Sequence, residues 1–313
     1  MYYIGIDGSK KALSVFDGKT SLEFENKEGL RPFYRYLKKH FKQFDNLVLI
    51  FEATGIYSDN LREFCNIHKI KAYILNPQQS HNFAKSLGVR SKTDKIDARI
   101  IWRYQSLIPQ ERIQIPLIDQ EAKMLASYLT SYQFIQGQRV SLSNHLERVT
   151  NPPLRKLLKV ELKRKQQLED KLLSDIKTYI SKHPGLAKDF KRLMSISGIG
   201  DKLAFSLLFL FRHYQGTNRA QITALVGLDP IYKESGSSVK GKIKISKNGN
   251  RYIRKMLYLP TLCAIKNNKK ISLFYQRLID NHKPKKVAVI AAMRKLLLVA
   301  HAVYNNKTEY VPG

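Results

Sequence analysis

Hydrophobic and polar residues alternate over short runs near the amino terminus, a pattern typical of β-strands. The first three predicted strands cover residues 2–7, 12–17 and 20–24, with a hairpin turn at 17–19. Two further strands are predicted at 47–51, a continuous apolar run that suits burial on both faces, and at 71–75. Helical spacing fills residues 30–41 and 58–67, and it returns after 76–77 and continues past Asp97. The predicted order is therefore βββαβαβα.

The middle of the chain changes to Leu, Lys, Glu and Gln, with apolar residues at helical spacing. These residues are Leu154, Leu158, Leu162, Leu168, Leu172, Ile176 and Ile180. Lys165 occupies a seam position, so the repeat is not a strict heptad, and both a coiled-coil pair and packing within a helical linker fit the pattern. His183-Pro184-Gly185 ends this region. We predict three domains, over residues 1–118, 119–185 and 186–313.

Four carboxylates stand at the ends of the predicted amino-terminal elements. Asp7 ends the first strand and Glu52 ends the fourth, while Asp94 and Asp97 lie three residues apart on one face of the last helix. Two-metal phosphoryl transfer needs such a cluster, because hard divalent cations take oxygen ligands. Each carboxylate also fits a turn or a helix N-terminus when taken alone. Together with the βββαβαβα order they match the ribonuclease-H-like fold and favour a metal site.

A similar Gly-Ile-Asp-Gly hairpin opens the sugar kinases and actin-like ATPases. Those proteins carry a second nucleotide-binding half with further glycine-rich turns. The rest of this chain is helical and basic instead, which leaves an ATPase as a minor alternative.

The chain is strongly basic, with 55 Lys and Arg against 25 Asp and Glu, a formal charge of +30 and a pI of about 10.0. A charge of this size repels itself in a compact protein and favours a polyanionic partner, of which nucleic acid is the leading candidate. The two cysteines, Cys65 and Cys263, lie far apart without zinc-ligand spacing, which argues against a disulfide scaffold or a zinc module. The amino terminus has no basic stretch followed by an apolar run, and no window of the sequence approaches eighteen uninterrupted apolar residues, so we expect a cytoplasmic protein.

Residues 193–200, followed by an apolar helix over 203–211, resemble a helix-hairpin-helix element. Gly198 and Gly200 would allow backbone amides at a helix N-terminus to approach a phosphate oxygen, beside the cation of Lys202. An ordinary glycine turn between packed helices is the alternative interpretation.

A loop of serines and glycines followed by a dense basic strip occupies residues 233–255. Lysines at 240, 242 and 244 alternate with apolar residues, which predicts a strand with one basic face, and a helix is expected to begin near Arg251. The residues expected to contact a phosphodiester backbone are Lys240, Lys242, Lys244, Lys247, Arg251 and Arg254. A solvated face is the alternative for such a run. The loop serines that qualify chemically as nucleophiles are Ser235, Ser237 and Ser238, although most loop serines only form hydrogen bonds in turns.

An ordered set of short motifs spans nearly the whole chain. The motifs are Gly5-Ile6-Asp7, Glu52-Ala53-Thr54-Gly55-Ile56-Tyr57, Asn76-Pro77, Lys92-Thr93-Asp94-Lys95-Ile96-Asp97-Ala98-Arg99, Ser197-Gly198-Ile199-Gly200, Gly227-Leu228, Glu234-Ser235-Gly236-Ser237-Ser238 and Ile245-Ser246-Lys247-Asn248-Gly249-Asn250. The ordered set resembles the insertion-sequence transposases of the IS one-ten and IS eleven-eleven group, to which site-specific invertases of pilin genes are related.

The resemblance implies a RuvC-like amino-terminal domain with a mixed sheet and an Asp-Glu-Asp-Asp site for Mg²⁺ or Mn²⁺, formed here by Asp7, Glu52, Asp94 and Asp97. It also implies a mainly helical carboxy-terminal transposase domain, in which Ser235 is the nucleophile. Family members cut and rejoin donor and target double-stranded DNA through a phosphoserine link, and some are guided by a bridge RNA.

The expected function is therefore that of a DNA transposase or site-specific recombinase. The helical middle is expected to join protomers into a homodimer or a tetramer, because recombination acts on several strands and one serine attacks only one of them. Two other functions fit the same residues: a RuvC-like nuclease that uses metal-activated water, and a non-catalytic accessory protein that only binds nucleic acid.

Overall fold

The computed structural model folds into two compact units, Met1–Ile118 and Asp119–Gly313. Each unit buries its own hydrophobic core. The structure describes residues 1–26, 30–53, 56–89, 93–231, 234–235, 239–240 and 244–311.

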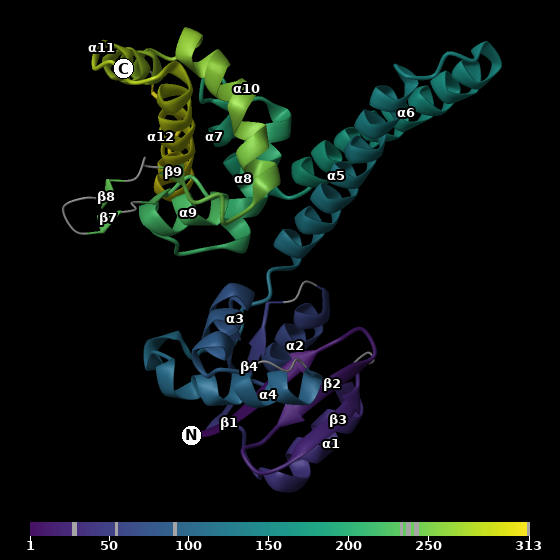
Figure 1. Cartoon of the computed structure of the whole chain (residues 1–313), viewed down its shortest axis with the longest axis vertical. Helices are drawn as coiled ribbons and strands as arrows, with labels where there is room; N and C mark the ends of the chain where they lie inside the picture. The colour runs from purple at the N-terminus through teal and green to yellow at the C-terminus, as the bar shows by residue number, and fades with distance from the viewer. Residues whose placement is uncertain are drawn as a thin grey trace. The chain divides into compact units, whose positions relative to one another are not determined.

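The amino-terminal unit is built on a five-stranded mixed sheet (Figure 1). Its strands are β1 (Tyr2–Gly8), β2 (Ala12–Phe16), β3 (Ser21–Glu25), β4 (Leu47–Glu52) and β5 (Lys71–Leu75), in the spatial order β3-β2-β1-β4-β5. The first three strands pair antiparallel, whereas β4 and β5 are parallel to β1. This arrangement confirms the predicted ribonuclease-H-like sheet.

Helices cover both faces of the sheet, because the strands bury apolar side chains on both sides. On one face, Ile4, Ile6 and Leu49 pack with the apolar sides of α1 (Arg31–His40) and α2 (Ile56–Ile67). On the other face, Val48 and Ile50 pack with Ile101 of α4 (Asp94–Arg103). The short helices η2 (Tyr104–Leu107) and η3 (Gln110–Arg112) follow α4.

The predicted helical run after residue 77 is two helices rather than one. The first, α3 (Pro77–Ser86), has Leu87 as its C-cap, and the next residue, Gly88, adopts a left-handed conformation with a φ of +69°. Glycine adopts this conformation without steric cost and commonly follows the end of a helix. The second helix, α4, begins afresh at Asp94 with Thr93 as its N-cap.

The second unit is mainly helical. It begins with two long helices, α5 (Gln120–Leu146) and α6 (Pro152–Ser181), which pack against each other within the chain as a hairpin (Figure 1). The helices that follow in the described part of this unit are α7 (Pro184–Met194), α8 (Asp201–His213), α9 (Arg219–Val226), α10 (Arg251–Asn267), α11 (Lys269–Asp280) and α12 (Lys285–Asn306). The mainly helical carboxy-terminal region is therefore confirmed.

One core joins the base of the α5–α6 hairpin to the helices that follow it. Leu125, Leu129 and Ile180 of the hairpin belong to the same buried cluster as Leu207 of α8 and Leu296 of α12. Within the described residues, α12 is the one helix long and apolar enough to cross a membrane. It packs against α7, α8, α9, α10 and α11 instead, so its composition is that of a core helix.

Candidate functional site

Two of the four predicted carboxylates end neighbouring parallel strands. Ile6 of β1 lies opposite Phe51 of β4, so Asp7 and Glu52 follow at the same edge of the sheet. Side chains alternate along a strand, which puts both carboxylates on the face that Val48 and Ile50 share. This is the face that α4 covers.

Helix α4 runs antiparallel to β1 across that face. Trp102 near its end donates an indole hydrogen bond of 3.0 Å to the Tyr3 carbonyl, and a Cβ on Gly5 would meet the backbone of Ala98 and Trp102. Asp94 lies one turn before Ala98. The first turn of α4, with Asp94 and Asp97, therefore points towards the Asp7 end of β1.

The fold thus places Asp7 and Glu52 at one edge of one sheet face and directs the first turn of α4 towards that edge. Asp94 is exposed, whereas Asp7, Glu52 and Asp97 are half-buried. Carboxylate oxygens are the ligands that Mg²⁺ and Mn²⁺ prefer, so the donor set fits a divalent cation. Across the described ranges, no three His, Cys, Asp or Glu side chains are grouped closely enough to hold an ion together. The four residues therefore have suitable ligand chemistry, but the structure does not group them as a metal cluster within its described part.

The predicted nucleophile lies in a small hairpin of the second unit. Ser235 belongs to β7 (Glu234–Ser235), which pairs antiparallel with β8 (Val239–Lys240), and Ser235 lies opposite Val239. Its side chain, that of Lys240, and the residues Ser237, Ser238 and Lys242 fall outside the described part. The choice among the serines therefore stays a prediction.

The predicted single basic strand over residues 239–245 is wrong. The segment forms two separate strands, because its halves have different partners: β8 pairs with β7, whereas β9 (Lys244–Ile245) pairs with β6 (Pro230–Ile231). Lys244 is exposed on β9.

The segment that follows β9 packs tightly on the end of α9. Ser246 donates a short hydrogen bond from its hydroxyl to the Asp229 carboxylate, and its amide donates to the Asp229 carbonyl at 2.9 Å. Any Cβ on Gly249 would meet the carbonyl of Ala224 at 2.7 Å. Asn250 then caps α10 by accepting from the Ile253 amide. Asp229 therefore anchors this segment. The sequence contains no motif that identifies Asp229 as important.

The predicted phosphate contacts around α10 divide into two groups. Arg251 and Lys247 are exposed and available to a ligand. Arg254 instead donates a 2.7 Å hydrogen bond to the Val226 carbonyl at the end of α9. Its guanidinium thus holds two helices together, as cations at helix C-termini do.

The glycine turn before α8 is a packing feature in this structure. Gly198 has a φ of +103°, and a Cβ there would lie 2.9 Å from the backbone of Ala264 in α10. Gly200 precedes Asp201, the first residue of α8, and nothing lies within 4 Å of the Cβ position at Gly200. The close approach to α10 explains Gly198 without a phosphate, whereas Gly200 leaves room for one.

Lys202 contributes to a buried polar cluster that the sequence did not indicate. Glu169 of α6 is 1% exposed and accepts hydrogen bonds from the Tyr132 hydroxyl at 2.7 Å and the Arg139 guanidinium at 2.6 Å, both from α5. Lys202 approaches the same carboxylate at 3.4 Å. Burial opposes ionisation of Glu169, but these hydrogen bonds and positive charges outweigh it and lower its pKa. The cluster ties the α5–α6 hairpin to α8.

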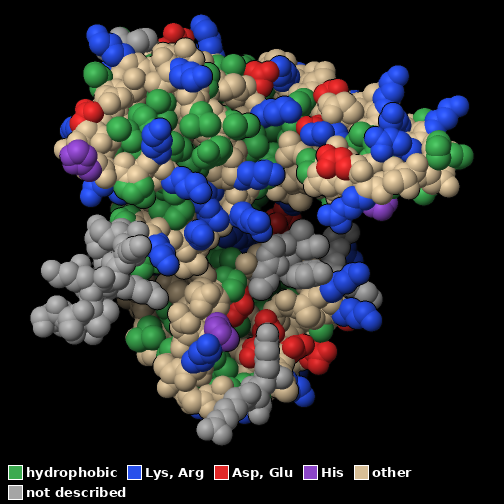
Figure 2. All heavy atoms as spheres, turned by 45° about the horizontal axis from the view of Figure 1, so that its top comes forward, with side chains coloured by type: hydrophobic (Ala, Val, Ile, Leu, Met, Phe, Trp, Pro, Cys, Tyr) green, Lys and Arg blue, Asp and Glu red, His purple; other side chains and the backbone are tan. Residues whose placement is uncertain are grey.

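The positive charge lies mainly in the second unit. Residues 119–313 contain 36 Lys and Arg against 13 Asp and Glu. Figure 2 shows Lys and Arg spread over the visible face of this unit, with fewer carboxylates among them. Such a surface attracts a polyanion over a wide area rather than at one contact.

Comparisons with known proteins converge on one group. A family model described as Transposase, of the DEDD type in IS110 elements, matches residues 4–151, and a model described as Transposase IS116/IS110/IS902 family matches residues 190–276. The chain is also similar to the pilin gene-inverting protein of Moraxella bovis, with 29% identity over 96% of this chain and 95% of that protein. The pilin gene-inverting protein of Moraxella lacunata is equally similar, at 29% identity with the same coverage.

Proposed function

Because the chain belongs to the IS116/IS110/IS902 family of transposases, we propose that it cuts and rejoins DNA through a covalent bond to Ser235, assisted by a divalent cation at Asp7, Glu52, Asp94 and Asp97. One observation supports this most strongly: Asp7 and Glu52 end adjacent strands on the face covered by α4, whose first turn carries the two other carboxylates. The first family match covers these four residues and the second covers the serine.

In the proposed reaction the Ser235 hydroxyl attacks a DNA phosphorus. A serine–phosphate ester forms while the phosphate bond to one strand end breaks, and that end leaves as a hydroxyl. A hydroxyl of the partner strand then reverses the step and frees the serine. Each step exchanges one phosphodiester for another, so no external energy source is needed. A bound divalent cation would stabilise negative charge on the phosphate oxygens.

Covalent trapping tests the proposal against its rivals. Labelled DNA, incubated with the full chain and Mg²⁺ and run on a denaturing gel, should yield a protein–DNA adduct that Ser235→Ala abolishes. Peptide mapping should place the DNA on Ser235. Free cleaved DNA without an adduct would indicate a metal-dependent nuclease, and intact DNA would indicate an accessory binding protein. An adduct on Ser237, Ser238 or Ser246 would keep the reaction class and move the nucleophile.

The α5–α6 hairpin supports assembly into a dimer or a tetramer as a second part of the proposal. Several of its large apolar side chains are exposed, among them Phe134 of α5 and Leu154, Leu157 and Val160 of α6. Apolar residues in such numbers on a hairpin favour contact with a second copy. Leu157→Asp should lower the oligomer mass in sedimentation without unfolding the chain, and a wild-type protein active only as a monomer would contradict this part.

A guide RNA encoded beside the gene is the third part. The basic surface of the second unit suits RNA as well as DNA, because double-stranded RNA is recognised largely by shape and backbone. RNA that copurifies with the protein and is required for strand exchange would support it, whereas full activity with RNA-free protein would exclude it. Since the substrate is cellular DNA, we expect the protein to work in the cytoplasm.

A further inference from the structure

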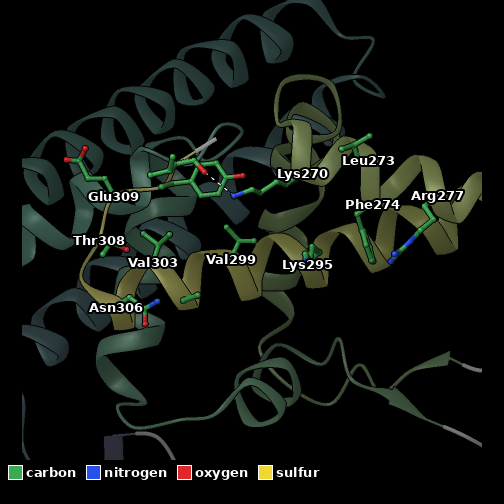
Figure 3. A pocket seen from close by; sticks show the side chains of 13 residues that line it. Lys270, Leu273, Phe274, Arg277, Lys295, Val299, Val303, Asn306, Thr308 and Glu309 are labelled. Atoms are coloured by element: carbon green, nitrogen blue, oxygen red, sulfur yellow. Dashed lines mark hydrogen bonds between the residues drawn. The ribbon is translucent and has the colours of Figure 1, made fainter. Parts of the chain in front are cut away.

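A groove of about 730 Å³ lies between α11, α12 and the segment that follows α12 (Figure 3). Val299 and Val303 of α12 line it, and Leu273 and Phe274 of α11 contribute further apolar surface. Leu273 is 63% exposed, although it is a large apolar side chain. The groove therefore presents apolar surface to the solvent.

Cations gather around one aromatic ring of this groove. The Arg277 guanidinium lies 5.6 Å and the Lys295 ammonium 5.8 Å from the Phe274 ring centroid. In the described part of the chain, no carboxylate forms an ion pair with either cation. Glu309, the acid that lines the groove, pairs with Lys191 at 3.3 Å. Two like charges beside one ring repel each other, and an anion placed with them would relieve this repulsion.

A third cation, Lys270, lies about two helical turns before Arg277 on α11 (Figure 3). The Lys270 ammonium donates to the Val311 carbonyl at 3.2 Å and lies 5.6 Å from the Tyr310 ring centroid. Arg277 and Lys295 thus share the Phe274 ring, and Lys270 lies next to the Tyr310 ring further back along α11. This spacing suits a linear polyanion better than a single small anion.

We propose that this groove binds an unpaired segment of a nucleic-acid strand. The phosphates of such a segment would pair with Lys270, Arg277 and Lys295. Its flat base faces would pack on Leu273 and Phe274. A duplex hides its base faces by stacking, and an acidic peptide lacks them. The inference concerns binding alone, so it stands without the serine mechanism proposed above.

Fluorescence anisotropy with the full-length protein tests the proposal. The probes are labelled single-stranded DNA and RNA oligonucleotides of about 15 nucleotides, within the usual site size, and a DNA duplex of the same length. The double variant Arg277→Gln/Lys295→Gln should bind both single strands at least tenfold more weakly. Its salt dependence should fall by about 0.7 per lost contact in the slope of log affinity against log salt. Duplex binding should change much less.

A matched variant separates the groove from general electrostatics. Lys163→Gln/Lys171→Gln removes the same charge from exposed positions on α6 and should leave single-strand affinity within about twofold. Equal losses in the two double variants, or no loss in the groove variant, would overturn the proposal. So would equal competition by polyglutamate and by an unlabelled oligonucleotide of the same charge.

Leu273→Asp tests the apolar part of the groove at an exposed position where folding is not at risk. It should weaken single-strand binding, and photo-crosslinking of the wild-type complex should map to the peptide over residues 270–277. A crosslink elsewhere, with Leu273→Asp binding normally, would refute base contact. Ser235→Ala should bind the probes normally, so a failure of the serine mechanism would leave this result unchanged.

Discussion

Gly5 is the position where the packing of the amino-terminal unit determines the geometry of its carboxylates. An added Cβ would lie 2.5 Å from the Trp102 amide nitrogen and 2.7 Å from the Trp102 Cβ, whereas ordinary contact begins at 3.4 Å. Because the closest atoms belong to the helix backbone, no side-chain rotation relieves the clash. In Gly5→Ala, α4 must therefore move away from β1 by about 1 Å.

Two effects should follow from Gly5→Ala. Overpacking of this kind costs about 1–3 kcal/mol of folding stability. Displacement of Asp94 and Asp97 from Asp7 by about 1 Å is enough to slow strand cleavage by about two orders of magnitude. DNA affinity should stay near the wild-type value, because most of the positive charge lies in the second unit.

Trp102 provides the assay, since it is the only tryptophan in the chain and lies at this contact. Its fluorescence during urea denaturation reports on the amino-terminal unit alone, and a gel assay measures cleavage. Gly137→Ala is the matched control. Gly137 lies within α5 with nothing inside 4 Å of its Cβ position, so alanine there should stabilise the helix by about 0.5–1 kcal/mol. Wild-type stability and cleavage in Gly5→Ala would refute the reasoning.

Three further predictions address the other parts of the molecule. Asp7→Ala or Asp97→Ala should abolish cleavage with DNA affinity largely kept, and chelation of divalent cations should do the same to the wild type; normal cleavage by either variant would exclude the metal site. Glu169→Ala should cost about 1–3 kcal/mol in chemical denaturation at neutral pH, because the buried Tyr132 hydroxyl and the partly exposed Arg139 guanidinium lose the carboxylate that they bind. Folding lowers the pKa of Glu169, so the ionised carboxylate stabilises the fold at pH values above the ordinary pKa of Glu. This stabilisation is lost as the pH falls through the folded-state pKa, and a loss of stability in Glu169→Ala that did not depend on pH would contradict the prediction. Joint neutralisation of Lys242, Lys244 and Arg251 should weaken DNA binding. It should also reduce the slope of log affinity against log salt by about 0.9 for each lost phosphate contact, and an unchanged slope would mean that these residues face solvent.

The sheet was predictable because its signals are local. Alternation, the turn at 17–19 and the apolar run of β4 each lie within a few residues, and they predicted the order of the strands along the chain. The match of that order to the ribonuclease-H-like fold then put Asp7 and Glu52 at the ends of neighbouring strands. The break between α3 and α4 was missed, because one left-handed glycine ended a helical pattern that otherwise continued.

Pairings between distant segments were not predictable from one sequence. A leucine stripe on α6 does not indicate which surface will cover it. In the structure α5 of the same chain packs against α6. Charge was equally ambiguous. Lys202 and Arg254 belong to the same basic population as Lys244, yet the first approaches a buried carboxylate and the second binds a helix end. Only tertiary structure separates a cation that binds its own protein from one that is free for a ligand.

The burial of Glu169 also determines how α5 and α6 align. Leucines on successive turns are interchangeable, so an apolar seam alone would tolerate a slip of one helical turn, about 5.4 Å, at little cost. After such a slip the Glu169 carboxylate would lose the Tyr132 hydroxyl and the Arg139 guanidinium and remain buried without them. An unpaired buried charge costs several kcal/mol. One carboxylate therefore selects a single register for the hairpin, and with it a fixed distance from the helical core to the hairpin tip.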